Sequence, residues 1–184
     1  MSTQGMAPTA AQIDALLPQT QCTRCGYGSC RPYAEAMARG EVLHNRCPPG
    51  GAEVVAALAR LLGRAPLPLD PACGSEAINR VAWVDPEACI GCARCLPACP
   101  VDAILGAQRH LHTVLQAACN GCELCLPACP VDCIHLRPRS DGIAVPTAAA
   151  NRTRFEQQRA RLQRESDARA TALTQAKRAA LPAP

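Results

Sequence analysis

The chain has 184 residues, of which 14 are cysteine and four are aromatic, and its formal net charge is +4. So few aromatic rings exclude a core built on large side chains, and no apolar stretch reaches the roughly 18–20 residues of a membrane-spanning helix. Because the N-terminus also lacks the basic and apolar regions of a secretory signal, we expect a reducing cytosol, where this many cysteines favour metal ligation over disulfides.

The first part of the chain predicts a small helical domain with four cysteines, at residues 9–63. Thr9 and Gln12 form a capping-box pattern that opens a first helix. A second helix is expected between the third and fourth cysteines. A third helix covers about residues 52–62, because its apolar side chains recur at helical spacing, and Gly63 ends it.

The middle of the chain contains an internal duplication. Residues 89–104 match residues 119–134 at 12 of 16 positions. Each copy is preceded by a strand-like apolar segment, at 81–84 and at 112–115. Because neither copy can bury its own apolar face, the two are expected to pack as one pseudo-symmetric unit. A Pro-rich linker at residues 64–80 separates this unit from the helical domain.

Each copy contains the motif C-x2-C-x2-C-x3-C-P. Three closely spaced thiolates wrap one iron–sulfur cubane, and the fourth, on a following helix, ligates the other cluster of the pair. Residues 81–145 are therefore predicted to form a bacterial 2[4Fe–4S] ferredoxin-like domain. The expected ligand sets are Cys89, Cys92, Cys95 and Cys129 for one cluster, and Cys99, Cys119, Cys122 and Cys125 for the other.

Two glycines and the zinc alternative bear on this assignment. Gly91 and Gly121 keep Cβ atoms out of the tight ligand loops. A zinc ribbon would use only two cysteines per knuckle, and it would leave the third thiol and the Cys-Pro pair of each copy unexplained. The spacing therefore favours iron–sulfur clusters over zinc.

The N-terminal cysteines have the less specific spacing C-x2-C-x4-C-x16-C. Four thiolates could hold a structural zinc ion or a third [4Fe–4S] cluster. The neighbouring ferredoxin-like unit favours a cluster, because an electron carrier gains from a further relay station. The expected ligands are Cys22, Cys25, Cys30 and Cys47.

The remaining cysteines and histidines receive no ligand role. A free cysteine is usually a small buried apolar residue, and twelve thiolates complete three cubanes without histidine. This group comprises Cys73, Cys133, His44, His110, His112 and His135, and the histidines are expected to be exposed or satisfied. Since the sequence shows no nucleophile–base pair, phosphate loop or flavin fingerprint, we expect no catalysis by the chain alone and no small-molecule substrate.

The last segment, residues 146–184, is a basic tail rich in Ala, Arg and Gln. Residues 151–184 contain eight basic and three acidic side chains. Helix propensity is high there, but apolar residues are too sparse for a core-facing stripe. We expect a helical or disordered tail, solvated or frayed. Its charge suggests two further roles, contact with anionic lipid or with nucleic acid.

Three stretches carry a resemblance to a known family. They are LPQTQCTRCGYGSCRPYAEAMARGE with NRCPPGG at 17–51, the double motif itself, and RHLHTVLQAACNGCELC at 109–125. Over about residues 9–138 the chain resembles the B subunit of the Rnf, or Rsx, electron transport complex. The resemblance implies three [4Fe–4S] clusters on the twelve cysteines. It also implies a complex that passes electrons between ferredoxin and nicotinamide pools while moving ions across the inner membrane.

The sequence leads to expectations about the fold, the localisation and the function of the protein. The fold class is α+β, with a helical four-cysteine iron–sulfur domain, a ferredoxin-like domain and a tail. Members of the family typically begin with a membrane-anchoring helix, which we do not find in this sequence. We therefore expect a cytoplasmic protein, peripheral on the inner membrane, that relays single electrons among other subunits. The alternatives are a free soluble ferredoxin serving cytosolic redox enzymes, and a redox or iron sensor that binds nucleic acid through the tail.

Overall fold

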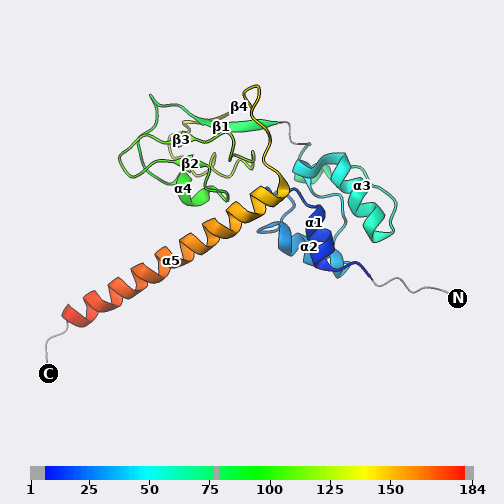
Figure 1. Cartoon of the computed structure of the whole chain (residues 1–184), viewed down its shortest axis with the longest axis horizontal. Coiled ribbons are helices and arrows are strands. Elements are labelled where there is room, and N and C mark those ends of the chain that lie inside the picture. The colour runs from blue at the N-terminus through cyan, green and yellow to red at the C-terminus, as the bar shows by residue number, and fades with distance from the viewer. Residues whose placement is uncertain (1–6, 77–78, 181–184) are drawn as a thin grey trace.

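The computed structural model describes residues 7–76 and 79–180. It shows two units side by side and a long terminal helix that starts where the units meet (Figure 1). The predicted α+β class is confirmed. Parts of three predicted segments lie outside the described residues. They are the N-terminus, which was predicted to lack a signal (1–6), two residues of the linker (77–78) and the last four residues of the tail (181–184).

The N-terminal unit consists of three helices around the first four cysteines. They are α1 (Ala10–Leu16), α2 (Cys30–Ala38) and α3 (Gly51–Leu62). The capping box at α1 is confirmed, since Gln12 N donates to Thr9 Oγ1 at 3.3 Å and Thr9 N donates to Gln12 Oε1 at 2.8 Å. Gly63 ends α3 in the left-handed conformation with φ of 63°, as predicted.

This unit has an apolar core of its own. The largest buried side chains in it are Ile13, Leu17, Tyr33, Met37 and Leu58. The Tyr33 hydroxyl donates to Leu43 O at 2.9 Å and accepts from Arg46 N at 3.0 Å. The single buried phenol thereby fixes the chain that leads from α2 to the fourth cysteine.

The segment after α3 runs back over the N-terminal unit. It includes the short turn η2 (Pro71–Cys73), while another, η1 (Pro48–Gly50), precedes α3. Asn45 Nδ2 donates to Pro68 O at 2.7 Å, and Asp70 N donates to Asn45 O at 2.9 Å. An ion pair of 3.2 Å joins Arg46 to Asp70. The predicted linker is therefore attached to this unit over part of its length.

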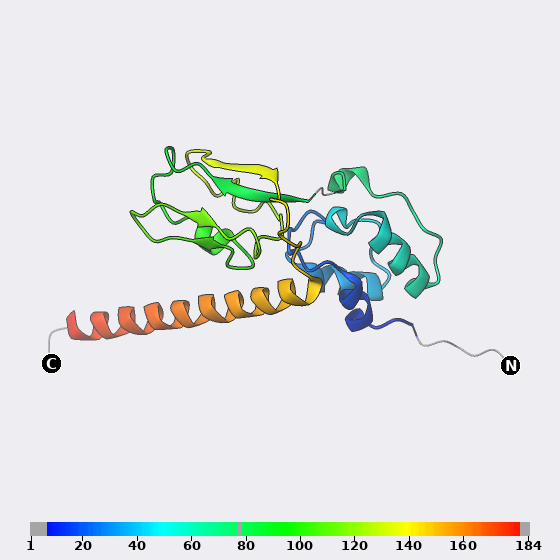
Figure 2. The ribbon, with the colours of Figure 1, turned by 45° about the horizontal axis from the view of Figure 1, so that its top comes forward.

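The second unit, residues 79–145, is called the repeat unit below. Its elements are β1 (Arg80–Val84), α4 (Cys95–Ala98), β2 (Ile104–Leu105), β3 (Thr113–Val114) and β4 (Ile134–Pro138). Each strand that precedes one copy pairs with the strand that follows the other copy, β1 with β4 and β3 with β2, both antiparallel. Figure 2 shows the two ribbons stacked over one another. The sequence predicted the strands before each copy, but not those after.

One expectation about the repeat unit is wrong. The fourth cysteine of each copy was expected on a helix. Cys99 instead directly follows α4, and the matching Cys129 directly follows the turns at residues 124–128. The left-handed residues Ala93 and Glu123, with φ of 60° and 67°, interrupt both loops two positions before the third cysteine, which leaves little chain for a regular helix.

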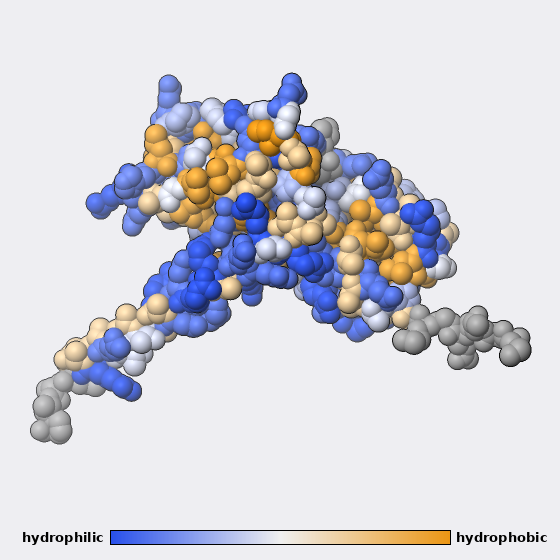
Figure 3. Space-filling view, in the orientation of Figure 1, coloured by the Kyte–Doolittle hydropathy of each residue, from blue (hydrophilic) through white to orange (hydrophobic). Residues whose placement is uncertain are grey.

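The tail forms one helix, α5 (Ala148–Ala180), whose first turn is capped when Ala150 N donates to Thr147 Oγ1 at 3.2 Å. It runs from the junction along the repeat unit and projects beyond it (Figure 2). Its surface is mainly hydrophilic, whereas apolar side chains gather over the repeat unit and α3 (Figure 3). Among the described helices, none is both long and apolar enough to cross a membrane.

The first half of α5 is attached to both units, contrary to the expectation of a solvated tail. Arg152 pairs with the buried Asp14 of α1 at 2.6 Å. Farther along, Gln158 Nε2 donates to Pro97 O at 3.4 Å, and Arg161 pairs with Asp102 at 2.6 Å. From residue 163 onward the described side chains are exposed. The helix therefore bridges the two units with polar contacts that an apolar-stripe criterion misses.

Candidate metal centres

The first four cysteines meet in the N-terminal unit. Cys22 and Cys25 lie in the loop before α2, Cys30 begins α2, and Cys47 precedes η1. All four line one pocket. This group of Cys22, Cys25, Cys30 and Cys47 is called the N-terminal site.

A buried chain of glutamines holds the loop of this site. Gln19, Gln21 and Thr23 all have positive φ values, of 57°, 55° and 61°, which are unfavourable for residues with a Cβ. Gln21 Oε1 accepts from Cys30 N at 2.8 Å, and Gln21 Nε2 donates to Gln19 Oε1 at 2.9 Å. Gln19 Nε2 in turn donates to Asp14 O at 2.7 Å. These buried amides compensate the strained loop, and the sequence pattern did not identify them.

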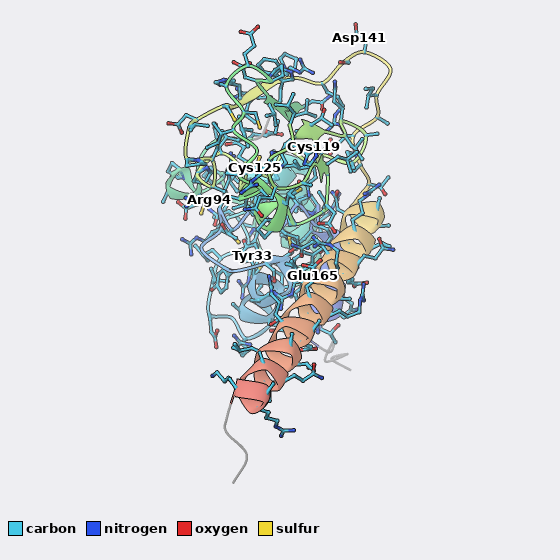
Figure 4. All side chains as sticks on the ribbon, turned by 90° about the vertical axis from the view of Figure 1, so that its left-hand side faces the viewer. Tyr33, Arg94, Cys119, Cys125, Asp141 and Glu165 are labelled. Carbon is cyan, nitrogen blue, oxygen red and sulfur yellow. The ribbon has the colours of Figure 1, made fainter. Side chains whose placement is uncertain are left out.

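The repeat unit contains a second group of four, called the inner site: Cys99, Cys119, Cys122 and Cys125. All four line one pocket, and Figure 4 shows Cys119 and Cys125 close together in the repeat unit. Gly121 has φ of 72°, and a Cβ there would lie 2.8 Å from Arg80 O. The predicted role of this glycine in the ligand loop is confirmed.

The third group, called the outer site, comprises Cys89, Cys92, Cys95 and Cys129. All four line one pocket. Gly91 takes the same place as Gly121, with φ of 67° and a would-be Cβ 2.8 Å from His110 N. The structure thus brings together all three predicted groups, including the fourth cysteines that the copies exchange. That they bind metal stays a prediction.

The electrostatics of the pockets fit a positively charged group. Burial raises the pKa of Cys30 and of Cys125 to about 12, and the pKa of Cys95 to about 11. Burial likewise raises the pKa of Cys47 and of Cys122. Because a buried thiolate is unfavourable without a cation, these thiols hold their protons, and a metal bound there would have to displace them.

Backbone amides already point at ligand sulfurs. Ala103 N donates to Cys99 Sγ at 3.2 Å. At the matching position of the other copy, the amides of Val131 and Cys133 donate to the Cys129 sulfur. Such donors stabilise negative charge on sulfur, as the ligands of an iron–sulfur cluster require.

The spacing of the cysteines also bears on the kind of metal group. Within residues 7–76 and 79–180, no three histidine, cysteine, aspartate or glutamate side chains converge closely enough to hold a single metal ion. The four cysteines of each site stand around a pocket instead. Four cysteines around one pocket are compatible with a [4Fe–4S] cluster, in which each thiolate binds a different iron.

The N-terminal and inner sites lie next to each other across the boundary between the units. Asn120 Nδ2 donates to Thr20 O at 3.1 Å, and these residues line the inner and the N-terminal pocket, respectively. Arg24, between Cys22 and Cys25, pairs at 2.6 Å with Glu123, between Cys122 and Cys125. The ligand loops of the two sites therefore contact each other directly.

The pockets also contain side chains to which the sequence pattern gave no role. His112 and Cys133 line the outer pocket, and Arg46 lines the N-terminal pocket. His110 and His135 are exposed as expected, whereas His44 and His112 are buried. Cys133 could have been found from the sequence, because it is one of the positions at which the two copies differ. Cys73 is buried outside the three pockets.

Family models match both cysteine-rich regions. A model described as "4Fe-4S dicluster domain" matches residues 82–136, which hold the inner and outer sites. A model described as "Putative Fe-S cluster" matches residues 17–49, which hold the N-terminal site. No solved structure shows a significant match to the chain.

Curated relatives share one name, that of the B subunit of the ion-translocating oxidoreductase complex. The protein of Alkalilimnicola ehrlichii is 65% identical over 132 residues, covering 71% of each chain. That of Serratia proteamaculans is 55% identical over 144 residues, covering 78% of this chain and 72% of the relative. That of Thiobacillus denitrificans is 56% identical over 108 residues, covering 59% and 57%. With such identity over more than two thirds of two relatives, the chain belongs to the family of B subunits of the ion-translocating oxidoreductase complex.

Proposed function

We propose that this protein is the electron-relay subunit of an ion-translocating oxidoreductase complex and that it holds three [4Fe–4S] clusters. The observation that carries the proposal is the gathering of twelve cysteines into three four-cysteine pockets. When bound, each cluster accepts and returns a single electron. The relatives are named as subunits of such a complex.

The order of the relay follows from the contacts between ligand loops. The N-terminal and inner sites are joined through the Thr20–Asn120 hydrogen bond and the Arg24–Glu123 ion pair. The inner and outer sites share one core, because each takes its fourth cysteine from the other's copy. Electrons are therefore proposed to pass along the series of N-terminal, inner and outer sites, in either direction.

The two sites of the repeat unit differ in how far their surroundings are exposed to water. The inner pocket is enclosed by Val101 and Ala103, each 1% exposed. The outer pocket is rimmed by Ile90 and Val131, which are 62% and 41% exposed. We place the contact with a redox partner at this outer rim, because exposed apolar side chains beside a cofactor allow close approach.

The partners are proposed to be other subunits of the complex, on the cytoplasmic side of the membrane. A reducing compartment would keep unligated thiols ready for cluster assembly. The exposed end of α5 stays available for contacts outside the chain. Two of the tail's basic side chains, Arg152 and Arg161, are already paired with carboxylates, which makes a nucleic-acid role less favourable than a structural one.

The test uses membranes that carry the complex from which this subunit has been deleted. Adding purified, cluster-loaded chain should restore electron transfer through the complex. The variants Cys30→Ser and Cys99→Ser should each lose one cluster and fail to restore it, while Cys73→Ser, outside the three pockets, should restore it fully. If iron-loaded wild-type chain binds the membranes and restores nothing, the relay function is wrong.

A further inference from the structure

We infer that His112 and Cys133 make the two pseudo-symmetric sites of the repeat unit unequal, by donating hydrogen bonds to ligand sulfurs of the outer site alone. The outer site would then have the higher reduction potential and hold the electron for the partner. The inference rests on the proposed function, because it concerns clusters at the inner and outer sites.

The two pockets of the repeat unit have matching walls. A shift of 30 residues relates their lining positions, so that Val101 of the inner pocket corresponds to Val131 of the outer pocket, and Ile104 corresponds to Ile134. Two of the matched positions replace a small apolar side chain by a hydrogen-bond donor. They are Ala82, which corresponds to His112, and Ala103, which corresponds to Cys133.

Cys133 lies against a predicted ligand. Its sulfur is 3.4 Å from Cys129 Sγ, and the residue is 4% exposed. A ligand thiolate carries no proton and can only accept, so the thiol of Cys133 must be the donor. At the inner site Ala103 leaves Cys99 with backbone donors alone.

His112 makes the second contact. Its Nδ1 is 3.4 Å from Cys89 Sγ, and the ring is 5% exposed. Because the thiolate accepts, Nδ1 carries the proton, while Nε2 has no partner among the described residues. Gly106 leaves room for the ring, since a Cβ at that position would collide with the imidazole. Ala82 at the matching inner position can donate nothing from its side chain.

These donors act on the energy of the added electron. Reduction makes a cluster one charge more negative, and hydrogen bonds to its sulfurs stabilise that charge and raise the potential. The inner site lacks both side-chain donors, so it should be the harder of the two to reduce. The electron should therefore rest at the outer site, beside the exposed rim of Ile90 and Val131.

The test is a redox titration of the anaerobic full-length protein, followed by EPR. Cys133→Ala and His112→Ala should each lower the same midpoint potential, by about a tenfold change in the reduction equilibrium, or 59 mV for one electron. His112→Asn keeps an N–H near the Nδ1 position, so its midpoint potential should stay close to that of the wild-type protein. Ala103→Cys adds a thiol at the inner site and should raise a different midpoint.

The outcomes separate this inference from the proposed function. If all clusters are present and neither Cys133→Ala nor His112→Ala moves a midpoint, the inference is overturned and the relay stands. A shift in His112→Asn as large as in His112→Ala would also overturn it, because the hydrogen bond would not be the cause. If wild-type protein binds no iron or sulfide at all, both the inference and the relay are wrong.

Discussion

The N-terminal unit and the repeat unit both surround predicted cluster sites, but their cores differ. The N-terminal unit packs three helices on large apolar side chains such as Ile13, Tyr33 and Leu58, and three of its four predicted ligand cysteines also belong to that core of nine residues. In the repeat unit, five of the thirteen core residues are cysteines, and the regular structure is two short ribbons and one helical turn. Because the repeat unit has so little regular structure, we predict that it depends on bound clusters for folding more than the three-helix N-terminal unit does.

Removal of the metal should therefore have the largest effect, and an unequal one. After anaerobic chelation, we expect the amides of β1 and β4 to lose nearly all protection from hydrogen exchange. Those of α1 and α2 should retain protection at least roughly tenfold above that of β1 and β4. Exchange followed by mass spectrometry measures both regions in one sample. Earlier opening of α1 and α2 would contradict the comparison.

The next largest effect is expected when a fourth cysteine, which serves the site of the other copy, is replaced. Cys99→Ser lies in the first copy but should empty the inner site, whose other cysteines lie in the second copy. Alkylation of the anaerobic variant should then label Cys119, Cys122 and Cys125 while Cys92 and Cys95 stay protected. Labels are read by peptide mass spectrometry.

The matched variant for this test is Cys95→Ser, which should expose the outer-site cysteines instead. If Cys99→Ser led to labelling of the cysteines in its own copy, the exchange of ligands between the copies would be wrong. The N-terminal site should stay unlabelled in both variants, because all four of its cysteines lie in the other unit.

The contacts of α5 should stabilise the N-terminal unit more than the repeat unit. Arg152→Ala removes the 2.6 Å partner of the Asp14 carboxylate, which is 2% exposed. Leaving a buried charge without its partner should lower the opening free energy of α1 by about 1.5–3 kcal/mol. Native-state hydrogen exchange at α1 measures this change, and Arg152→Lys should recover part of it. An unchanged α1 would mean that Gln19 alone satisfies the carboxylate.

The smallest effect is expected where α5 meets the repeat unit. Arg161 and Asp102 are both 36% exposed, and ion pairs so accessible to water contribute about 1 kcal/mol or less. Arg161→Ala should therefore change the free energy of unfolding by less than Arg152→Ala, and the effect of Arg161→Ala should vanish at high salt. Urea unfolding at two ionic strengths tests this ranking, and the reverse order would contradict it.

The sequence predicted what depends on local spacing. The Thr9 capping box, the end of α3 at Gly63 and the glycines of both ligand loops are confirmed. The exchange of ligands between copies was predicted from the motif, and the structure places the cysteines accordingly.

Contacts between distant segments could not be predicted in this way. The Arg152–Asp14 pair joins residues 138 positions apart, and Asn120 meets Thr20 across 100 positions. No local pattern marks either pair. The role of His112 was also hidden, because the aligned Ala82 lies in a strand that the motif comparison treated only as a flank. The pairing of β4 with β1 joins the two ends of the repeat unit, so it depends on tertiary packing.

The most direct test of the central claim is iron and sulfide analysis of anaerobically prepared full-length protein, with zinc measured in the same sample. Three [4Fe–4S] clusters require about twelve iron and twelve sulfide per chain, with no zinc. About eight iron with one zinc would contradict the assignment of the N-terminal site, and the absence of iron would contradict the relay as a whole.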